Sequence, residues 1–179
     1  AVFNGSTSKI DISDNNNLSF SNIPFSVTYI IKFNSAPTIK VIIAKDENTP
    51  NREYLIDYFN TGFRVILFNN DGSANIQTIT TTPIVVGNYY IVTHTFDGGL
   101  FASGIKTYIN GLLVSTSNTE NAAFIGMSNT TSNLEIGYWG LVSGRELLGE
   151  LDDTLIWNKE LSQTEVTNIY AQQNAGLEL

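Results

Sequence analysis

Two adjacent carboxylates, Asp152 and Asp153, stand inside the segment GELDDTLIW near the end of the chain. The segment alternates apolar and polar residues like a half-buried β-strand, where charge is costly unless it is paired or bound to a cation. Glu150 stands two positions before Asp152, a spacing that puts both acids on one face of a strand. These acids could act in catalysis, hold a metal ion, or simply face water.

Few other residues in the sequence could take part in catalysis. The chain has no cysteine, which excludes a disulfide framework, a thiol nucleophile and a zinc site built on cysteine. His94 is the only histidine and falls in YYIVTHTF, which has the composition of a strand. We interpret His94 as a strand residue with a satisfied hydrogen bond rather than as part of a Ser-His-Asp triad.

Length and composition indicate one folded, β-rich domain. The chain has 179 residues, of which 42% are hydrophobic and 15% charged, enough to bury a sizeable core. Nine Lys and Arg residues against seventeen Asp and Glu residues give a net charge of -8, which disfavours nucleic acid as a partner. The sequence contains no window near the length of about eighteen apolar residues that membrane insertion requires. The chain starts at Ala1 without a signal peptide, so we expect residues 1–179 to be a single domain excised from a larger protein.

The chain reads as many short strands followed by one helix. Asn110-Gly111 stands between two alternating runs and predicts a hairpin with a type I′ turn. Ser162 and Glu165 form a capping box, and an apolar face follows it, which predicts a helix over 162–173. This pattern favours an all-β sandwich or jelly roll with one short C-terminal helix. Strands are expected at 25–33, 39–46, 53–59, 63–70, 75–82, 89–96, 105–116, 133–140 and 150–157.

The order of these segments resembles the laminin-G-like, concanavalin A-like jelly rolls. The similarity covers nearly the whole chain, and its motifs are strand and turn patterns in a characteristic order. They are AVFNGSTSKIDISDNNNL, FSVTYIIKF, GNYYIVTHTFDGG, IKTYINGLLV with its Tyr-x-Asn-Gly, NLEIGYWG, and the closing GELDDTLIWNKELSQTEVTNIY. The resemblance implies two antiparallel sheets packed face to face, one of them curved into a shallow concave surface.

The resemblance also bears on the use of the acids in catalysis. Laminarinase-type enzymes of this superfamily carry Glu-x-Asp-x-x-Glu or a close variant, with a nucleophile and a general acid about 5 Å apart in retaining enzymes. Glu150 and Asp152 match the start of that motif, but Leu155 stands where the third acid belongs. We therefore expect no catalytic residues in this chain.

A metal ion is the second use that the resemblance implies. Jelly rolls of this family often hold calcium, which takes roughly six to eight oxygen ligands. Asp152 occupies a position where the family commonly has an acid, and Asn4 one where it often has Asp. If the first and last strands are neighbours, Asp152, Asn4 and the Gly5 carbonyl would share a structural calcium ion. The alternative is that Asp152 accepts ordinary hydrogen bonds and Asp153 faces solvent.

Candidate ligand-binding residues lie in the polar loops. Sugar sites combine an aromatic platform with amides and acids. Tyr138 and Trp139 end a strand and precede a loop that contains Arg145, so they could form such a platform. The alternative is that Trp139 packs over the edge of the sandwich. The further candidates at the rim are Glu47, Arg52, Asn70 and Asp71, with Asp46, Asn51 and Asn69 beside them.

These observations together predict a non-catalytic recognition module that binds carbohydrate. We expect a glycan or polysaccharide as its partner and an extracellular, cell-surface or virion-associated location. One alternative is a protein-binding or structural adhesion module, which the same fold serves. The other alternative is a glycan-active enzyme.

Overall fold

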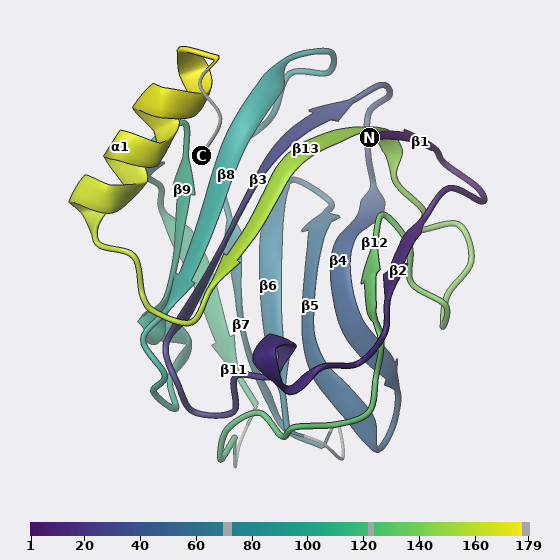
Figure 1. The fold of residues 1–179 in the computed structure, drawn as a ribbon, viewed down its shortest axis with the longest axis vertical. Coiled ribbons are helices and arrows are strands. Elements are labelled where there is room, and N and C mark those ends of the chain that lie inside the picture. Colours follow the sequence, from purple (N-terminus) through teal and green to yellow (C-terminus); the bar gives the residue numbers. More distant parts are fainter. Residues whose placement is uncertain (70–72, 122–123, 177–179) are drawn as a thin grey trace.

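A computed structural model describes residues 1–69, 73–121 and 124–176 as two antiparallel sheets packed face to face, with one α-helix outside them (Figure 1). The six-stranded sheet has the order β1 (Val2–Asn4), β13 (Leu148–Trp157), β3 (Phe25–Phe33), β8 (Tyr89–Phe96), β9 (Ile105–Ile109), β10 (Leu112–Leu113). The seven-stranded sheet has the order β11 (Thr116–Glu120), β7 (Asn75–Thr80), β6 (Gly62–Phe68), β5 (Asn51–Phe59), β4 (Ile39–Asn48), β12 (Leu134–Ile136), β2 (Ile10–Ile12). The helix is α1 (Gln163–Asn174), and two short 3-10 turns are η1 (Asn16–Leu18) and η2 (Ala102–Gly104). The predicted all-β jelly-roll sandwich with one C-terminal helix is confirmed.

The main hydrophobic core lies between the two sheets. Alternate residues of β3, such as Val27, Tyr29 and Ile31, are fully buried in it. Aromatic rings fill much of the space, and Phe63 meets Tyr58 edge to face with ring centroids 5.4 Å apart. Each large apolar side chain buried in this way contributes about 1.5–3 kcal/mol to folding. The core therefore fixes the register of the strands that carry the surface sites.

The strand predictions agree best where alternation is strong. β3 and β8 have the predicted bounds, and the Asn110-Gly111 hairpin joins β9 to β10 with positive φ at both turn residues, 51° and 78°. Sequence reasoning treated the N-terminal segment as one strand and loop, whereas β1 joins the six-stranded sheet and β2 the seven-stranded one. It also missed β11, because this edge strand is polar and largely exposed and so lacks a hydrophobic pattern.

The predicted helix is confirmed and packs outside the six-stranded sheet. Ser162 caps α1, its hydroxyl accepts from the Glu165 amide, and the Glu165 carboxylate accepts from the Ser162 amide at 2.8 Å. Val166 and Ile169 pack with Trp157, Tyr108 and Leu161 in a separate hydrophobic cluster. This cluster fastens the helix to the outer face of β9 and β13 (Figure 1).

His94 is buried and satisfied, as interpreted from the sequence. Its Nε2 lies 2.8 Å from the Tyr29 hydroxyl and its Nδ1 lies 3.0 Å from the Thr107 hydroxyl. Burial lowers the pKa of His94 to about 3, so the ring is neutral at physiological pH. His94 therefore contributes to the core and not to a surface site.

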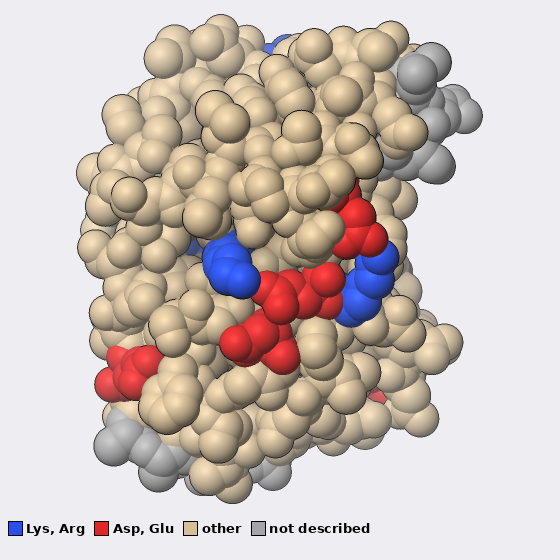
Figure 2. All heavy atoms as spheres, turned by 90° about the vertical axis from the view of Figure 1, so that its left-hand side faces the viewer, with Lys and Arg blue, Asp and Glu red and all other residues tan. Residues whose placement is uncertain are grey.

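Charge is gathered locally on the side of the molecule that carries α1. Figure 2 shows most of the charged side chains of this face in one group, with acidic and basic residues in contact. The ion pair between Lys106 and Glu160 joins β9 to the segment before the helix at 2.7 Å. In the described residues, no helix is long and apolar enough to cross a membrane.

Candidate functional site

The two acids of β13 lie at a β-bulge. The pairing register with β3 shifts between Asp152 and Leu155, and Asp153 takes a positive φ of 40°. Both carboxylates are exposed, and Asp152 Oδ1 accepts from the Asp153 amide at 3.1 Å. The bulge interrupts the alternation of the strand and turns both charges to solvent. Their charge therefore needs no buried partner.

Glu150 is tied to its neighbours on the outer face of the same sheet. It pairs with Lys32 of β3, and its Oε2 accepts from the Tyr89 hydroxyl at 2.6 Å. The Lys32 hydrogen bond, followed by that of Tyr89, lowers the pKa of Glu150. A general acid must hold a proton near neutral pH, so this carboxylate is poorly suited to that role.

The structure does not bring the proposed calcium ligands together. β1 and β13 are neighbours, as the calcium hypothesis required, but Asn4 lies opposite Leu148. Asp152 is four residues further along β13, about 13 Å away at the usual rise of a strand. This register therefore contradicts the prediction that Asp152, Asn4 and the Gly5 carbonyl share one calcium ion.

Asn4 has a different role, in the turn that follows β1. Its Oδ1 accepts from the amides of Ser6, Thr7 and Ser8 at 3.0, 2.9 and 3.1 Å. Gly5 has φ +74°, and its amide donates to the Leu147 carbonyl at 2.8 Å. Within the described ranges, no group of three or more His, Asp or Glu side chains could hold a metal ion. A calcium ion bound elsewhere stays a prediction.

Trp139 is buried against the outer face of the seven-stranded sheet. Only 8% of it is exposed, and its Nε1 donates to the Asp46 carbonyl at 2.9 Å. It forms a second hydrophobic cluster with Val41, Ala44, Leu55, Ile66 and Phe68. This burial argues against Trp139 as part of an aromatic sugar platform and matches the packing alternative, whereas Tyr138 is half-buried. The indole fastens the segment 137–147 to β4.

The charged candidates around Trp139 lie close together, but each has a partner. Arg52 makes a bidentate ion pair with the buried Asp46 at 2.9 and 2.8 Å, and it lies 3.7 Å from the centre of the Phe68 ring. Arg145 lies 5.2 Å from the Trp139 ring centre. We call Asp46, Arg52, Phe68, Trp139 and Arg145 the tryptophan cluster.

The remaining candidates are more scattered. Glu47 Oε1 accepts from the Asn133 amide at 2.9 Å, and the Tyr138 ring lies 5.2 Å from the Lys9 ammonium. Asn51 pairs with Asn48 at the β4–β5 turn, and Asn69 Oδ1 accepts from the Ala74 amide at 2.8 Å. Asn70 and Asp71 lie outside the described residues.

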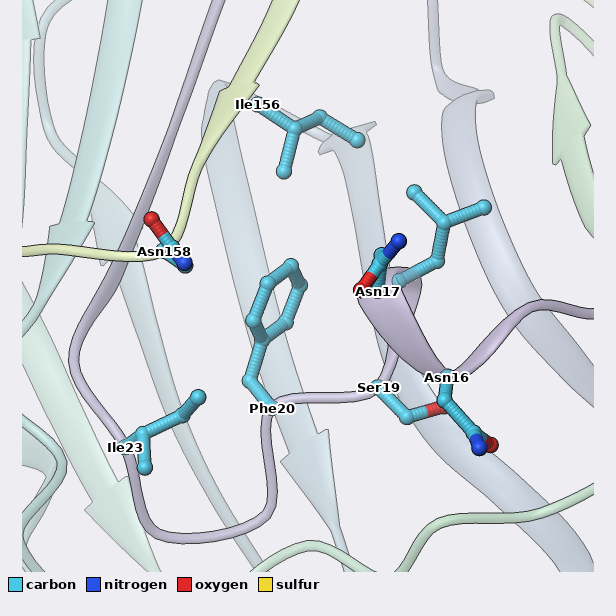
Figure 3. A pocket seen from close by; sticks show the side chains of 8 residues that line it. Asn16, Asn17, Ser19, Phe20, Ile23, Ile156 and Asn158 are labelled. Atoms are coloured by element: carbon cyan, nitrogen blue, oxygen red, sulfur yellow. The ribbon is translucent and has the colours of Figure 1, made fainter.

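Sequence reasoning missed a cleft of about 380 Å³ between η1 and the end of β13. In Figure 3 the Phe20 ring stands at its centre, with Asn158 and Asn17 on either side and Ile156 above. We call this the asparagine cleft. It is lined by Asn16, Asn17, Leu18, Ser19, Phe20, Ile23, Ile156 and Asn158.

The floor of the asparagine cleft is fixed. Phe20 is 1% exposed and stacks on Phe25 with ring centroids 4.3 Å apart and an interplanar angle of 8°. The Tyr54 ring packs tilted against Phe20, with ring centroids 5.9 Å apart, and its hydroxyl donates to the Leu18 carbonyl at 3.0 Å. The segment 18–20 is thus held against the main core. The floor of the cleft would therefore need no rearrangement on ligand binding.

The walls of the cleft carry hydrogen-bonding groups that are free. Within the described part of the chain, the side-chain amides of Asn17 and Asn158 make no hydrogen bond. Asn16 Oδ1 accepts from Asn129 at 3.0 Å, which leaves its own Nδ2 available. None of the eight described lining residues is charged. This lining would suit an uncharged ligand with both apolar and hydroxyl or amide groups.

Part of this site has a signal in the sequence. The run Asn15-Asn16-Asn17 ends a polar stretch, and the Asn15 side chain accepts from the Asn17 amide at 2.9 Å to start η1. Such a run indicates a turn. Asn158 lies more than a hundred residues later, and only the strand order brings it to the same cleft.

Solved structures with the same fold include several toxin domains. The binding domain of botulinum neurotoxin serotype G has a TM-score of 0.74 at 15% identity and covers 97% of this chain and 42% of that chain. The binding domain of Paraclostridial Mosquitocidal Protein 1 has 0.72 at 16%, covering 96% and 42%. The receptor-binding domain of botulinum neurotoxin D has 0.70 at 21%, covering 96% and 43%. The chain thus spans less than half of each, and at these identities the likeness shows the fold alone.

The family assignment comes from the sequence profile that matches. No curated protein sequence matched the chain. The profile described as the concanavalin A-like lectin/glucanases superfamily matches residues 4–167, which run from the end of β1 into α1. Because this match extends over most of its length, the chain belongs to the concanavalin A-like lectin/glucanase superfamily.

Proposed function

We propose that this chain is a non-catalytic recognition module that binds a neutral carbohydrate in the asparagine cleft. The observation that carries the proposal is the pair of free amides, Asn17 and Asn158, on either side of a fixed aromatic floor. Membership of a superfamily that includes lectins supports it. The structural neighbours described as binding domains or receptor-binding domains support a binding role in general.

The chemistry of the cleft suits a sugar ring. Each asparagine amide offers a donor and an acceptor side by side, which can hydrogen-bond to two neighbouring hydroxyl groups of a sugar. Ile23 and Ile156, which are at least partly exposed, offer apolar surface for the C–H groups of the ring above the buried Phe20. At about 380 Å³ the cleft is at the small end of the usual range of ligand pockets. We therefore expect it to hold one or two sugar units of a longer glycan.

The proposal also covers catalysis and location. Glu150 is held as a carboxylate by Lys32 and Tyr89, and the third acid of the laminarinase-type motif is missing, so we infer a module without hydrolytic activity. We infer that it works outside the cell, on a cell surface or on a virion, where a glycan ligand is available. A structural calcium ion remains part of the proposal only at a site other than Asp152 and Asn4.

A protein partner is the second candidate function, and one observation favours it. Leu112 and Leu113 on the short edge strand β10 are 71% and 56% exposed. Neighbouring exposed apolar side chains on a sheet edge are a common feature of interaction surfaces. A partner protein would contact β10, whereas a glycan would occupy the asparagine cleft, so variants separate the two functions.

The test is a glycan array with the wild-type chain, in calcium and in EDTA, followed by titration calorimetry with the glycan class that binds. Asn17→Ala and Asn158→Ala each remove one free amide and should weaken binding about tenfold. Asn88→Ala, an exposed asparagine in another loop, is the matched control and should bind like wild type. Silence across the array, or equal binding by all variants, would refute the asparagine cleft as a glycan site.

A further inference from the structure

A second cavity lies between the last turn of α1 and the outer face of the six-stranded sheet. It has a volume of about 370 Å³ and shares no residue with the asparagine cleft. We call it the helix groove. It is lined by Ile30, Tyr89, Ile91, Asn110, Asp152, Tyr170, Gln173 and Asn174.

Gln173 is the unusual residue of the helix groove. It stands seven positions after Val166, on the side of α1 that packs on the sheet, where an apolar residue would be expected. Only 8% of the residue is exposed, and among the described residues neither Nε2 nor Oε1 has a hydrogen-bond partner. Burying an amide without partners costs free energy, so a residue kept here at that cost needs a reason.

The sheet supplies an apolar base for the groove. Ile30 of β3 and Ile91 of β8 lie directly opposite one another, and Asp152 is the partner of Ile30 in β13. The exposed carboxylate of Asp152 therefore stands beside the isoleucine pair. This places an anionic acceptor next to a small apolar surface.

An aromatic ring completes the groove. Tyr89 is 55% exposed, yet its hydroxyl donates to Glu150 at 2.6 Å and its ring centre lies 4.8 Å from the Lys32 ammonium. These two contacts hold the ring in one orientation. An exposed ring with a fixed orientation is a suitable surface for the C–H face of a sugar.

We propose that the helix groove binds an N-acetylated hexosamine. A carboxamide offers one donor and one acceptor side by side, and its best complement is another amide, which the acetamido group supplies. The acetamido methyl group would pack on Ile30 and Ile91, Asp152 would accept from ring hydroxyls, and Tyr89 would contact the ring. Both amide atoms of Gln173 are covered where they lie, so the proposal requires this side chain to rotate towards the ligand.

This inference shares the carbohydrate class with the proposed function but rests on other residues. The test uses methyl N-acetyl-β-glucosaminide as the probe, with methyl β-glucoside, which lacks the acetamido group, as the comparison. Binding to the 179-residue chain is followed by titration calorimetry and by saturation-transfer NMR on the acetyl methyl group. Wild type should prefer the acetylated probe at least about tenfold.

Variants assign that binding to the groove. Gln173→Leu should lose binding of the acetylated probe about tenfold or more while its Tm equals or exceeds that of wild type, because an apolar side chain removes the unpartnered amide. Gln172→Leu, at the exposed neighbouring position, is the matched control and should bind normally. Asp152→Asn, at an exposed site, should also weaken binding without loss of folding.

Three results would overturn the inference. They are equal affinity for the two probes, unchanged binding in Gln173→Leu, and a loss of acetylated-probe binding in Asn158→Ala that Gln173→Leu does not share. The last result would assign the sugar to the asparagine cleft and so support the proposed function alone. Array binding that survives Gln173→Leu but is lost in Asn158→Ala would likewise assign the glycan to the asparagine cleft and not to the helix groove.

Discussion

The tryptophan cluster and the asparagine cleft each combine a fixed aromatic ring with polar side chains, but they differ in how the polar groups are used. In the tryptophan cluster the indole is buried, its N–H donates to a carbonyl, and Arg52 is held by both oxygens of Asp46. In the asparagine cleft the aromatic ring is equally fixed, but the amides of Asn17 and Asn158 have no partner among the described residues. Aromatic and polar residues near a loop do not by themselves make a binding site. The proposed site differs in that its hydrogen-bonding groups lie free beside a fixed apolar surface.

The largest effect should come from Trp139→Ala. Removing a buried tryptophan leaves a cavity and removes the hydrogen bond to the Asp46 carbonyl, so the free energy of unfolding should fall by about 3–5 kcal/mol. Urea denaturation measures this change. Glycan binding per folded molecule should stay within twofold of wild type, at roughly the error expected for a remote site. If Trp139→Ala unfolds like wild type but no longer binds the glycan, the tryptophan cluster and not the asparagine cleft would be the binding site.

The pH dependence of stability should come from the core, whereas binding in the asparagine cleft should not change with pH. Burial holds the pKa of His94 at about 3, below its unfolded value near 6.5. As pH falls, His94 is therefore protonated in the unfolded chain before it is protonated in the folded protein. This contribution to stability is complete above about pH 6.5 and declines as pH falls towards 3, by up to about 1.4 kcal/mol per pH unit.

Thermal melts between pH 8 and pH 5, with His94→Gln for comparison, measure this decline. The slope between pH 6.5 and pH 5 should be shallower in His94→Gln than in wild type. The cleft lining contains no titratable side chain among its described residues, so affinity should be constant over the same range. An affinity that falls with pH in the same way as the melting temperature would mean that a titratable group contacts the ligand.

Asn158→Ala should separate binding from stability in the opposite direction to Trp139→Ala. The residue is exposed and makes no hydrogen bond within the described part of the chain, so its loss should change unfolding by less than about 0.5 kcal/mol. Glycan affinity should fall by about tenfold, equal to roughly 1.4 kcal/mol. Paired calorimetry and urea titrations on one preparation give both numbers. A loss of stability larger than the loss of affinity would contradict the assignment of Asn158 to the cleft.

The smallest effect should come from Asp152→Ala. Asp152 lies at an exposed bulge, about 13 Å from Asn4 along the strand, so any stabilisation by calcium should be the same in the variant and in wild type. Thermal melts in calcium and in EDTA check this for both chains. A calcium-dependent shift in wild type that disappears in Asp152→Ala would restore Asp152 as a ligand.

The sequence predicts those parts of the fold whose physical signal is local. β3 and β8 alternate strongly, the Asn110-Gly111 turn requires positive φ, and the Ser162 capping box marks the start of α1. The pairing of β1 with β13 was a condition of the calcium hypothesis, and the structure contains it, but its register separates Asn4 from Asp152. β11 is polar and exposed, so no periodicity marks it.

The sites were harder to predict because they depend on contacts between distant segments. Trp139 looks the same in sequence whether its ring is exposed or lies on Phe68 and Leu55. Asn17 and Asn158 are ordinary loop residues until β13 brings them to the same cleft. Whether an amide is free is a property of the folded chain, and the sequence contains no pattern for it.

One NMR measurement tests the central claim most directly. A neutral oligosaccharide selected on the array is titrated into labelled protein, and the side-chain amide signals of Asn17 and Asn158 are followed together with the indole signal of Trp139. We predict that both asparagine signals shift with one common dissociation constant while the Trp139 signal stays in place. A shift of the Trp139 signal with both asparagine signals unmoved would contradict the account.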